Sequence, residues 1–410
     1  MKITFGKVQV LILSIYIIIN TYALFYILLS KETFGDFTLA LKNENLLLLA
    51  YISVIVPFVF FNFYFFPYLQ NKIRLARVML PVETKVTIFV LLLQLTFVAF
   101  NLIEGVNSAG STTTTNSPLK YLFIIFAPDL FFVICYGFAR HNKFFKYNLI
   151  VYLLSNFQRG WLGGLLTVMI IEFFVYYKKY GFSRRLILSV ASIGIFIIAL
   201  SPYLIALKWA ARAYFGGGSS GADAELDLIM SLGNKDYLTS LIDSLNYIIA
   251  RFQILSNTYL IFENSSIISS AAQKSEFVSF YLVGLPQMMI FKLFGLDYQM
   301  LNSFIVSILD PNYYINESTY NTHTGWFSWV IAEPYLIIQY LIFSVLLVWG
   351  VVYVSAKIGG KYMFFVSWVM TLMLFMQGWI HAYMSFFVAL ITFLFVKACL
   401  NFKAQANRNS

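Results

Sequence analysis

Residues 8–29 read VQVLILSIYIIINTYALFYILL, an apolar run of about 22 residues that contains no charged side chain. An α-helix rises about 1.5 Å per residue, so about 20 such residues cross the hydrocarbon core of a bilayer. The run is longer than the core of a signal peptide, and no small-residue cleavage site follows it. It therefore predicts a retained transmembrane helix.

The rest of the chain repeats this pattern. Another apolar stretch, 147–177, is broken in its middle by polar residues that include Arg159. A continuous helix would bury Arg159 at a cost of about 2.5 to 3.5 kcal/mol, which favours a hairpin of two helices with Arg159 near its tip. Single spans are predicted at 46–68, 86–103, 119–138, 186–207, 325–348, 362–379 and 382–397.

These runs predict an all-α polytopic membrane protein with about ten transmembrane helices. Two further apolar stretches, 241–262 and 277–296, would raise the number to twelve if both crossed the membrane. The composition agrees with this class, because 60% of the 410 residues are hydrophobic and 11% are charged. An average soluble protein carries roughly 25% charged residues.

The net charge of +10 does not indicate a nucleic-acid partner, because the basic residues lie between apolar runs. Their distribution orients the chain by the positive-inside rule, with both termini in the cytoplasm. The side assigned to the cytoplasm holds 18 of the 28 basic residues, namely Lys2, Lys7, Lys72, Arg74, Arg77, Lys85, Arg140, Lys143, Lys146, Lys178, Lys179, Arg184, Arg185, Lys357, Lys361, Lys397, Lys403 and Arg408.

This orientation divides the chain into three segments. Residues 1–207 are predicted to form an N-terminal transmembrane bundle, 208–322 a large external loop and 323–410 a C-terminal bundle. Within the loop, apolar residues from Leu238 to Tyr259 recur at three- and four-residue spacing, which predicts an amphipathic helix.

Ionisable residues inside predicted spans are candidate site residues, because a charge at membrane depth needs a partner, water or a ligand. Asp129 and Glu333 occupy such positions. Each could form a structural hydrogen bond or line a cavity that binds substrate. Glu172 lies six residues from Lys178, and we expect it to reach the membrane edge.

Four external cations lie near span ends or amphipathic surfaces: Arg159, Lys208, Arg212 and Arg251. A guanidinium pairs bidentately with phosphate oxygens, so these side chains could hold a lipid-linked diphosphate. Alternatively, each could pair with a local carboxylate such as Asp243 or anchor among headgroups. Arg159 has no acidic residue close to it in the sequence.

His323 precedes a predicted span on the external side, where a neutral imidazole could take a proton from a hydroxyl. His381 is the other external histidine, and His141 lies among the cytoplasmic cations. The two cysteines, Cys135 and Cys399, offer neither a disulfide framework nor metal-ligand spacing. No nucleotide loop or metal cluster is recognisable, so an enzyme of this kind would need an activated substrate such as a polyprenyl diphosphate sugar and no cofactor or metal.

The order of three motifs resembles that of bacterial O-antigen polymerases of the Wzy type, in the superfamily that includes the O-antigen ligases. The first is SNFQRGWLGGLL in the hairpin. The second is the large loop, with RFQIL at 251–255 and GLPQMM. The third is THTGWFSWVIAEPYLIIQYLIFSVLL, where the chain re-enters the membrane.

The resemblance implies a GT-C-like membrane glycosyltransferase that acts on undecaprenyl-diphosphate-linked oligosaccharides at the periplasmic face. It assigns the donor diphosphate to Arg159, Arg212 and Arg251, and the deprotonation or orientation of the acceptor hydroxyl to His323. Membrane lipids and a polysaccharide chain-length regulator are the other partners that it implies. The alternatives are an O-antigen ligase and a non-enzymatic flippase for lipid-linked sugars.

Overall fold

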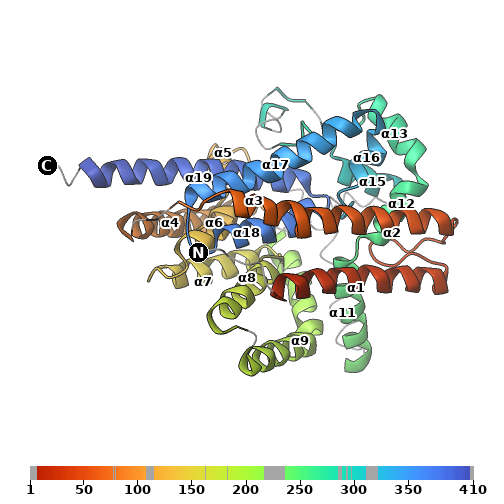
Figure 1. Cartoon of the computed structure of the whole chain (residues 1–410), viewed down its shortest axis with the longest axis horizontal. Helices are drawn as coiled ribbons and strands as arrows, with labels where there is room; N and C mark the ends of the chain where they lie inside the picture. The colour runs from red at the N-terminus through yellow and green to blue at the C-terminus, as the bar shows by residue number, and fades with distance from the viewer. Residues whose placement is uncertain are drawn as a thin grey trace. The chain divides into compact units, whose positions relative to one another are not determined.

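A computed structural model of the chain describes residues 7–76, 78, 80–107, 115–161, 163–181, 183–216, 236–284, 289–291, 294–296, 298–310 and 322–406. Helices make up nearly all of the regular structure in these ranges (Figure 1), where the one β-type contact is an isolated bridge between Glu32 and Ala40. Among them, 7 helices are long and apolar enough to cross a membrane: Gln9–Ser30, Glu44–Lys72, Pro81–Glu104, Leu119–Ala139, Arg184–Lys208, Pro334–Ile358 and Ile380–Asn401.

The all-helical fold is therefore confirmed, and its apolar helices are those of a polytopic membrane protein. Met363–Phe375 is apolar but shorter than a full crossing. The count of ten to twelve spans stays a prediction.

The chain forms two compact units. The first comprises Met1–Leu75, Ile249–Lys357 and Met370–Leu390, and the second comprises Ala76–Ile248, Ile358–Val369 and Ile391–Ser410. Each unit takes residues from all three segments that the sequence predicts, and the division into two membrane bundles and an external loop stays a prediction.

In the first unit, α1 (Lys7–Ser30) and α2 (Glu44–Val59) run side by side at the red end of the chain in Figure 1. The Asn43 side chain caps α2 by accepting hydrogen bonds from two backbone N–H groups. A π-helical turn, Phe60–Phe65, continues α2 into α3 (Phe66–Lys72). The later elements of this unit are α12 (Leu255–Glu263), α13 (Ser265–Gln273), α15 (Leu301–Leu309), α16 (Ser328–Ala332), α17 (Ile337–Ile358) and the π-helical turn Thr371–Phe375.

The core of the first unit explains why α12 packs on α1 and α2. Its members are apolar residues from α1, α2, α12, α15 and the loop after α1: Ala23, Leu24, Ile27, Phe37, Leu47, Ala50, Leu255, Tyr259, Leu260 and Val306. Burying them stabilises the loop between α1 and α2 against the start of α12.

The second unit contains α4 (Leu80–Glu104), α5 (Leu119–Phe126), α6 (Pro128–Ala139), α7 (Phe145–Gln158), α8 (Gly163–Tyr180) and α9 (Arg184–Gly216). Helices α4, α6 and α7 contact one another. Phe132 stacks on Tyr152 with ring centroids 4.2 Å apart and on Phe145 at 5.8 Å. Four helices contribute residues to both units: α11 (Tyr237–Phe252), α17, of which only Ile358 belongs to the second unit, α18 (Met363–Met370) and α19 (Ile380–Ala406).

Two predicted boundaries are wrong. The span expected at 325–348 corresponds to an apolar helix that begins at Pro334. Proline is favoured in the first turn of a helix, and Gly325 has a φ of 77°, so the chain before Pro334 forms only the short helix α16. The expected amphipathic helix is also divided, because α11 ends at Phe252 and α12 begins at Leu255.

Candidate functional site

Asp36 and Arg251 form an ion pair in the first unit. Asp36 lies in the loop that joins α1 to α2, and Arg251 lies in the last turn of α11. Nη1 of Arg251 is 3.1 Å from Oδ1 of Asp36. The Asp36 side chain is 15% exposed and the Arg251 side chain 41%. A largely buried carboxylate therefore holds a guanidinium that reaches solvent.

A close backbone approach brings these two residues together. The Nε2 of Gln253 donates to the Phe34 carbonyl at 2.6 Å, and the Ile254 N–H donates to Oδ1 of Asn20 at 3.0 Å. Gly35 has a φ of 132°, and a Cβ there would lie 2.8 Å from the Gln253 Nε2. Only glycine fits this backbone conformation without strain.

Asn257 and Thr322 extend the Asp36 pair into a network. Thr322 Oγ1 donates to Oδ2 of Asp36 at 2.7 Å. The Asn257 amide donates to Thr322 Oγ1 and to the His323 carbonyl, each at 2.8 Å. Arg251 at the end of α11, Asn257 in α12 and Thr322 before α17 are thus joined to the Asp36 carboxylate.

His323 accepts a hydrogen bond from Trp379 in the same unit. The Trp379 Nε1–H donates to Nδ1 of His323 at 2.6 Å, with ring centroids 5.3 Å apart. An indole nitrogen can only donate, so Nδ1 must be unprotonated in this contact. In the neutral ring the proton then lies on Nε2, and His323 presents a donor to any ligand on that side.

The environment keeps His323 neutral. Burial, opposed by the charge of Asp36 and assisted by the smaller effect of Arg251, lowers the pKa of His323 from 6.5 to about 4. Desolvation is the largest of these causes. A histidine in this state is uncharged at pH 7.

A tight chain crossing fixes Trp379 beside His323. Gly378 has a φ of 82°, and a Cβ there would lie 2.5 Å from Thr324 Oγ1 and 2.6 Å from the Gly325 nitrogen. The Gly325 N–H donates to the Gln377 carbonyl at 3.2 Å. The segment before Trp379 therefore lies directly on the segment after His323.

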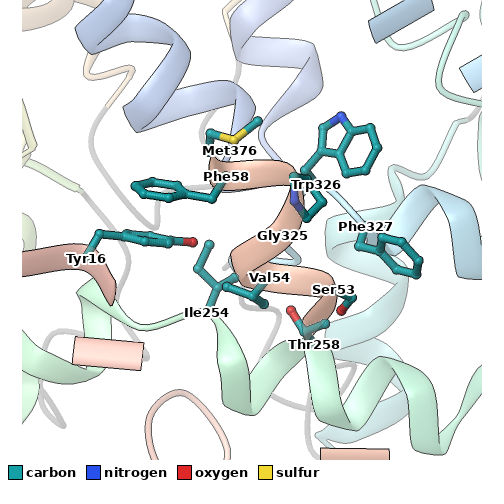
Figure 2. A pocket seen from close by; sticks show the side chains of 11 residues that line it. Tyr16, Ser53, Val54, Phe58, Ile254, Thr258, Gly325, Trp326, Phe327 and Met376 are labelled. Atoms are coloured by element: carbon teal, nitrogen blue, oxygen red, sulfur yellow. The ribbon is translucent and has the colours of Figure 1, made fainter. Parts of the chain in front are cut away.

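A small cavity adjoins this crossing in the first unit. Figure 2 shows its lining, which comes from α1, α2, α12 and the segments around Gly325 and Met376. It has room for about one water molecule, so it cannot hold a sugar ring. The lining residues are Tyr16, Ser53, Val54, Pro57, Phe58, Ile254, Thr258, Gly325, Trp326, Phe327 and Met376.

Glu333 also lies in the first unit, where its side chain is buried. Its Oε2 accepts a hydrogen bond from Ser279 Oγ at 2.7 Å and lies 3.5 Å from the Phe280 nitrogen. Burial raises the pKa of Glu333, and these hydrogen bonds oppose the rise. These contacts join the Ser279 segment to the end of α16.

Arg159 and Asp129 form an ion pair in the second unit. Nη2 of Arg159 is 2.6 Å from Oδ2 of Asp129, which lies in the first turn of α6. The guanidinium also lies 5.1 Å from the Phe97 ring centroid and 4.9 Å from that of Trp161. The Arg159 side chain is only 3% exposed. Its counter-charge therefore comes from a residue 30 positions earlier in the chain.

Lys208, at the end of an apolar stretch in the second unit, donates from Nζ to the Tyr247 hydroxyl at 2.8 Å. Arg212 belongs to α9, but its side chain lies outside the described residues. The structure thus brings Arg251 together with His323 and Arg159 together with Asp129.

Four residues of the first network were not expected from the sequence: Asp36, Asn257, Thr322 and Trp379. Asp36 is the acid of the loop that follows the first apolar run, and Trp379 is two residues from His381. Either position could have been noticed. Asn257 and Thr322 could not have been identified, because nothing in the sequence distinguishes them from the many other uncharged polar residues of the chain.

Within the described ranges, no three His, Cys, Asp or Glu residues lie close enough together to hold a metal ion. Comparisons of the chain with protein-family models, with curated proteins and with solved structures give no match. The fold and the apolar helices define the class as a polytopic α-helical membrane protein.

Proposed function

We propose that the chain is a membrane glycosyltransferase, an O-antigen polymerase that joins undecaprenyl-diphosphate-linked oligosaccharide repeat units. The observation that supports this proposal is the link between Arg251 and His323. The family resemblance assigns Arg251 to the donor diphosphate and His323 to the acceptor hydroxyl. Both are joined to Asp36 through one hydrogen-bond network. A partly exposed guanidinium in a protein of apolar helices suits a lipid with a charged diphosphate.

Arg251 would bind the donor diphosphate. As the bond between the sugar and the diphosphate breaks, negative charge grows on the departing phosphate oxygen, and a fixed guanidinium stabilises it. Asp36 would hold Nη1 of Arg251 in place. Arg159 and Arg212 are the other arginines that the resemblance assigns to the donor.

The acceptor hydroxyl must lose its proton as its oxygen bonds to the sugar carbon. His323 cannot accept this proton through Nδ1 while Trp379 donates to that atom. Its Nε2–H would instead orient an acceptor or diphosphate oxygen. The proton would pass to the Asp36 carboxylate, which has lone pairs beyond those that Arg251 and Thr322 use.

A strain that lacks the gene tests the proposal, with its lipopolysaccharide analysed by gel. Loss of a polymerase should leave lipid A core bearing one repeat unit. Bare core with accumulated lipid-linked polymer would instead indicate a ligase. Purified protein that forms no polymer from lipid-linked repeats, yet moves them across vesicle membranes, would indicate a flippase.

The proposed location is a bacterial inner membrane, with residues 208–322 in the periplasm and both termini in the cytoplasm. Alkaline phosphatase is active only outside the cytoplasm, so a fusion at residue 230 should be active and a fusion at the C-terminus inactive. An active C-terminal fusion would contradict this orientation.

A further inference from the structure

A second cluster of polar side chains lies in the second unit, and it consists of two lysines and a histidine. Nζ of Lys178, at the end of α8, donates to the backbone carbonyl of Lys361 at 3.2 Å. The ring centroid of Tyr362 lies 5.1 Å from the Lys178 Nζ, 5.5 Å from the Lys361 Nζ and 5.8 Å from the ring of His141. Three basic side chains therefore surround one aromatic ring.

The backbone turn before Tyr362 sets this arrangement. Gly360 has a φ of 107°, and a Cβ there would lie 2.6 Å from the Gly137 carbonyl oxygen. The Tyr362 N–H donates to the same oxygen at 3.2 Å. The turn is thus fixed on α6 by backbone contacts, which hold Lys361 close to Lys178 although their charges repel.

The electrostatic environment of the cluster is positive. Burial and, to a smaller extent, the charge of Lys361 together lower the pKa of Lys178 to about 8. The pKa of His141 is lowered by burial and by the neighbouring charges of Lys361, Arg140 and Lys179. No carboxylate contributes to either shift.

The acid nearest to the cluster on α8 already has a partner. Glu172 lies 2.7 Å from Nη2 of Arg140 and also accepts a hydrogen bond from Tyr136. Lys178, Lys361 and His141 themselves form no ion pair within the described residues. The positive charges of Lys178 and Lys361 are therefore not neutralised by this part of the chain.

The position of the cluster indicates what could neutralise it. His141 lies two residues after the end of Leu119–Ala139, which is long and apolar enough to cross a membrane. The end of such a helix lies at the level of the lipid headgroups. Basic pockets between transmembrane helices at this level bind lipid phosphates.

We propose that Lys178, Lys361 and His141 bind the phosphate of an anionic phospholipid of the phosphatidylglycerol kind. The Tyr362 ring forms the floor of the site, and the lipid chains lie along the apolar surface beside it. This inference concerns the second unit alone and does not depend on the proposed glycosyltransferase activity.

The test compares the purified full chain with its Lys178→Gln/Lys361→Gln double variant in nanodiscs. Lipid retention is measured by native mass spectrometry, and thermal stability is measured in phosphatidylglycerol or in phosphatidylcholine. We expect phosphatidylglycerol to stabilise the wild type more than phosphatidylcholine does. The double variant should bind phosphatidylglycerol about tenfold more weakly or worse. In phosphatidylcholine it should be at least as stable as the wild type, since it lacks the repulsion.

The matched control is Lys143→Gln/Lys146→Gln, which also removes two positive charges of the second unit; these lysines lie over the rings of Phe144 and Tyr147, away from the Tyr362 ring. It should keep the wild-type preference for phosphatidylglycerol. Equal lipid binding by both double variants would overturn the site. Equal stabilisation by inorganic phosphate, without anionic lipid, would overturn its assignment to a phospholipid.

Discussion

The indole N–H of Trp379 donates to Nδ1 of His323 at 2.6 Å, which occupies the one lone pair that a neutral imidazole could use as a base. His323 and Trp379 are 56 positions apart in the chain. Their contact changes the role that the sequence suggests for His323 from proton acceptor to hydrogen-bond donor.

The first prediction is that neutral His323 is protonated on Nε2. The chain has 3 histidines, so nitrogen NMR of protein labelled at histidine can resolve each ring, with His141→Gln and His381→Gln variants for assignment. Trp379→Phe keeps an aromatic ring but removes the donor, so Nδ1 should protonate at a higher pH than in the wild type. A wild-type His323 that carries its proton on Nδ1 would refute the hydrogen bond.

The second prediction concerns stability against pH. The pKa of His323 is lowered from 6.5 to about 4 in the folded protein, so the unfolded chain binds more protons between these values. The titration of His323 therefore does not change the free energy of unfolding above pH 6.5. That free energy decreases by up to about 3 kcal/mol as the pH falls from 6.5 toward 4. Denaturant unfolding at pH 7 and at pH 4.5 should show a smaller loss for His323→Gln than for wild type. Equal losses would place the acid sensitivity elsewhere.

The third prediction concerns Arg251. Its removal should slow polymer formation about a hundred- to thousandfold, because one charge-assisted hydrogen bond to the transition state is lost. Arg251→Lys keeps the charge but not the planar fork, so it should recover only part of the rate. Asp36→Asn should also be slow, since it keeps the shape of the side chain without the proton acceptor.

The assay for Arg251 is the ladder of polymer lengths in a deletion strain, with the amount of each variant in the membrane measured in parallel. Lys274→Ala is the matched control, because Lys274 is an exposed cation at the end of α13. Full ladders from Arg251→Ala at normal expression would remove Arg251 from the donor site.

The apolar runs of the sequence predict where membrane-spanning helices lie, because the thickness of the hydrocarbon core and the rise per residue of a helix together determine how long such a run must be. The runs at 8–29 and 119–138 agree with observed helices to within one or two residues. Arg159 coincides with a helix end, since its charge interrupts the apolar run between α7 and α8. The prediction that a helix begins at residue 325 is wrong, because Gly325 and Pro334 determine the local backbone conformation. A hydropathy pattern contains no information on backbone conformation.

The partners of the charged residues could not be predicted in the same way. Arg159 pairs with Asp129, and Arg251 pairs with Asp36, across long stretches of sequence. Such pairs depend on how helices pack, and no local spacing encodes them. The sequence could identify which cations needed a partner, but not which acid each would meet.

The fourth prediction separates a structural role of Arg159 from donor binding. Arg159→Met and Asp129→Leu each leave a buried charge unpaired, which should cost about 3 to 5 kcal/mol of stability. The double variant replaces the pair with apolar groups and should recover most of that loss. Thermal unfolding in detergent measures this coupling. A stable double variant with normal activity would show that Arg159 serves the fold, whereas a stable but inactive one would support donor binding.

The last prediction uses three glycines to separate backbone strain from steric overlap. Gly378→Ala should be the most damaging, because its φ of 82° is unfavourable and its Cβ would lie 2.6 Å from the nitrogen and 2.7 Å from the oxygen of Gly325. Gly105 has a φ of 62° with nothing near its Cβ position, so Gly105→Ala isolates the conformational cost of about 1 to 2 kcal/mol. Gly194, in α9, also has an open Cβ position and no unusual φ, so Gly194→Ala should be neutral or slightly stabilising.

The measurements for this series are the unfolding temperature and the NMR signal of His323. Gly378→Ala alone should disturb that signal, because it displaces Trp379 from His323. Adding Thr324→Ala should rescue little, since the overlap with the backbone of Gly325 remains when Thr324 Oγ1 is removed. If Gly378→Ala were as stable as Gly105→Ala with an unchanged His323 signal, the two segments could not cross as closely as described, and the contact that prevents His323 from acting as a base would lose its support.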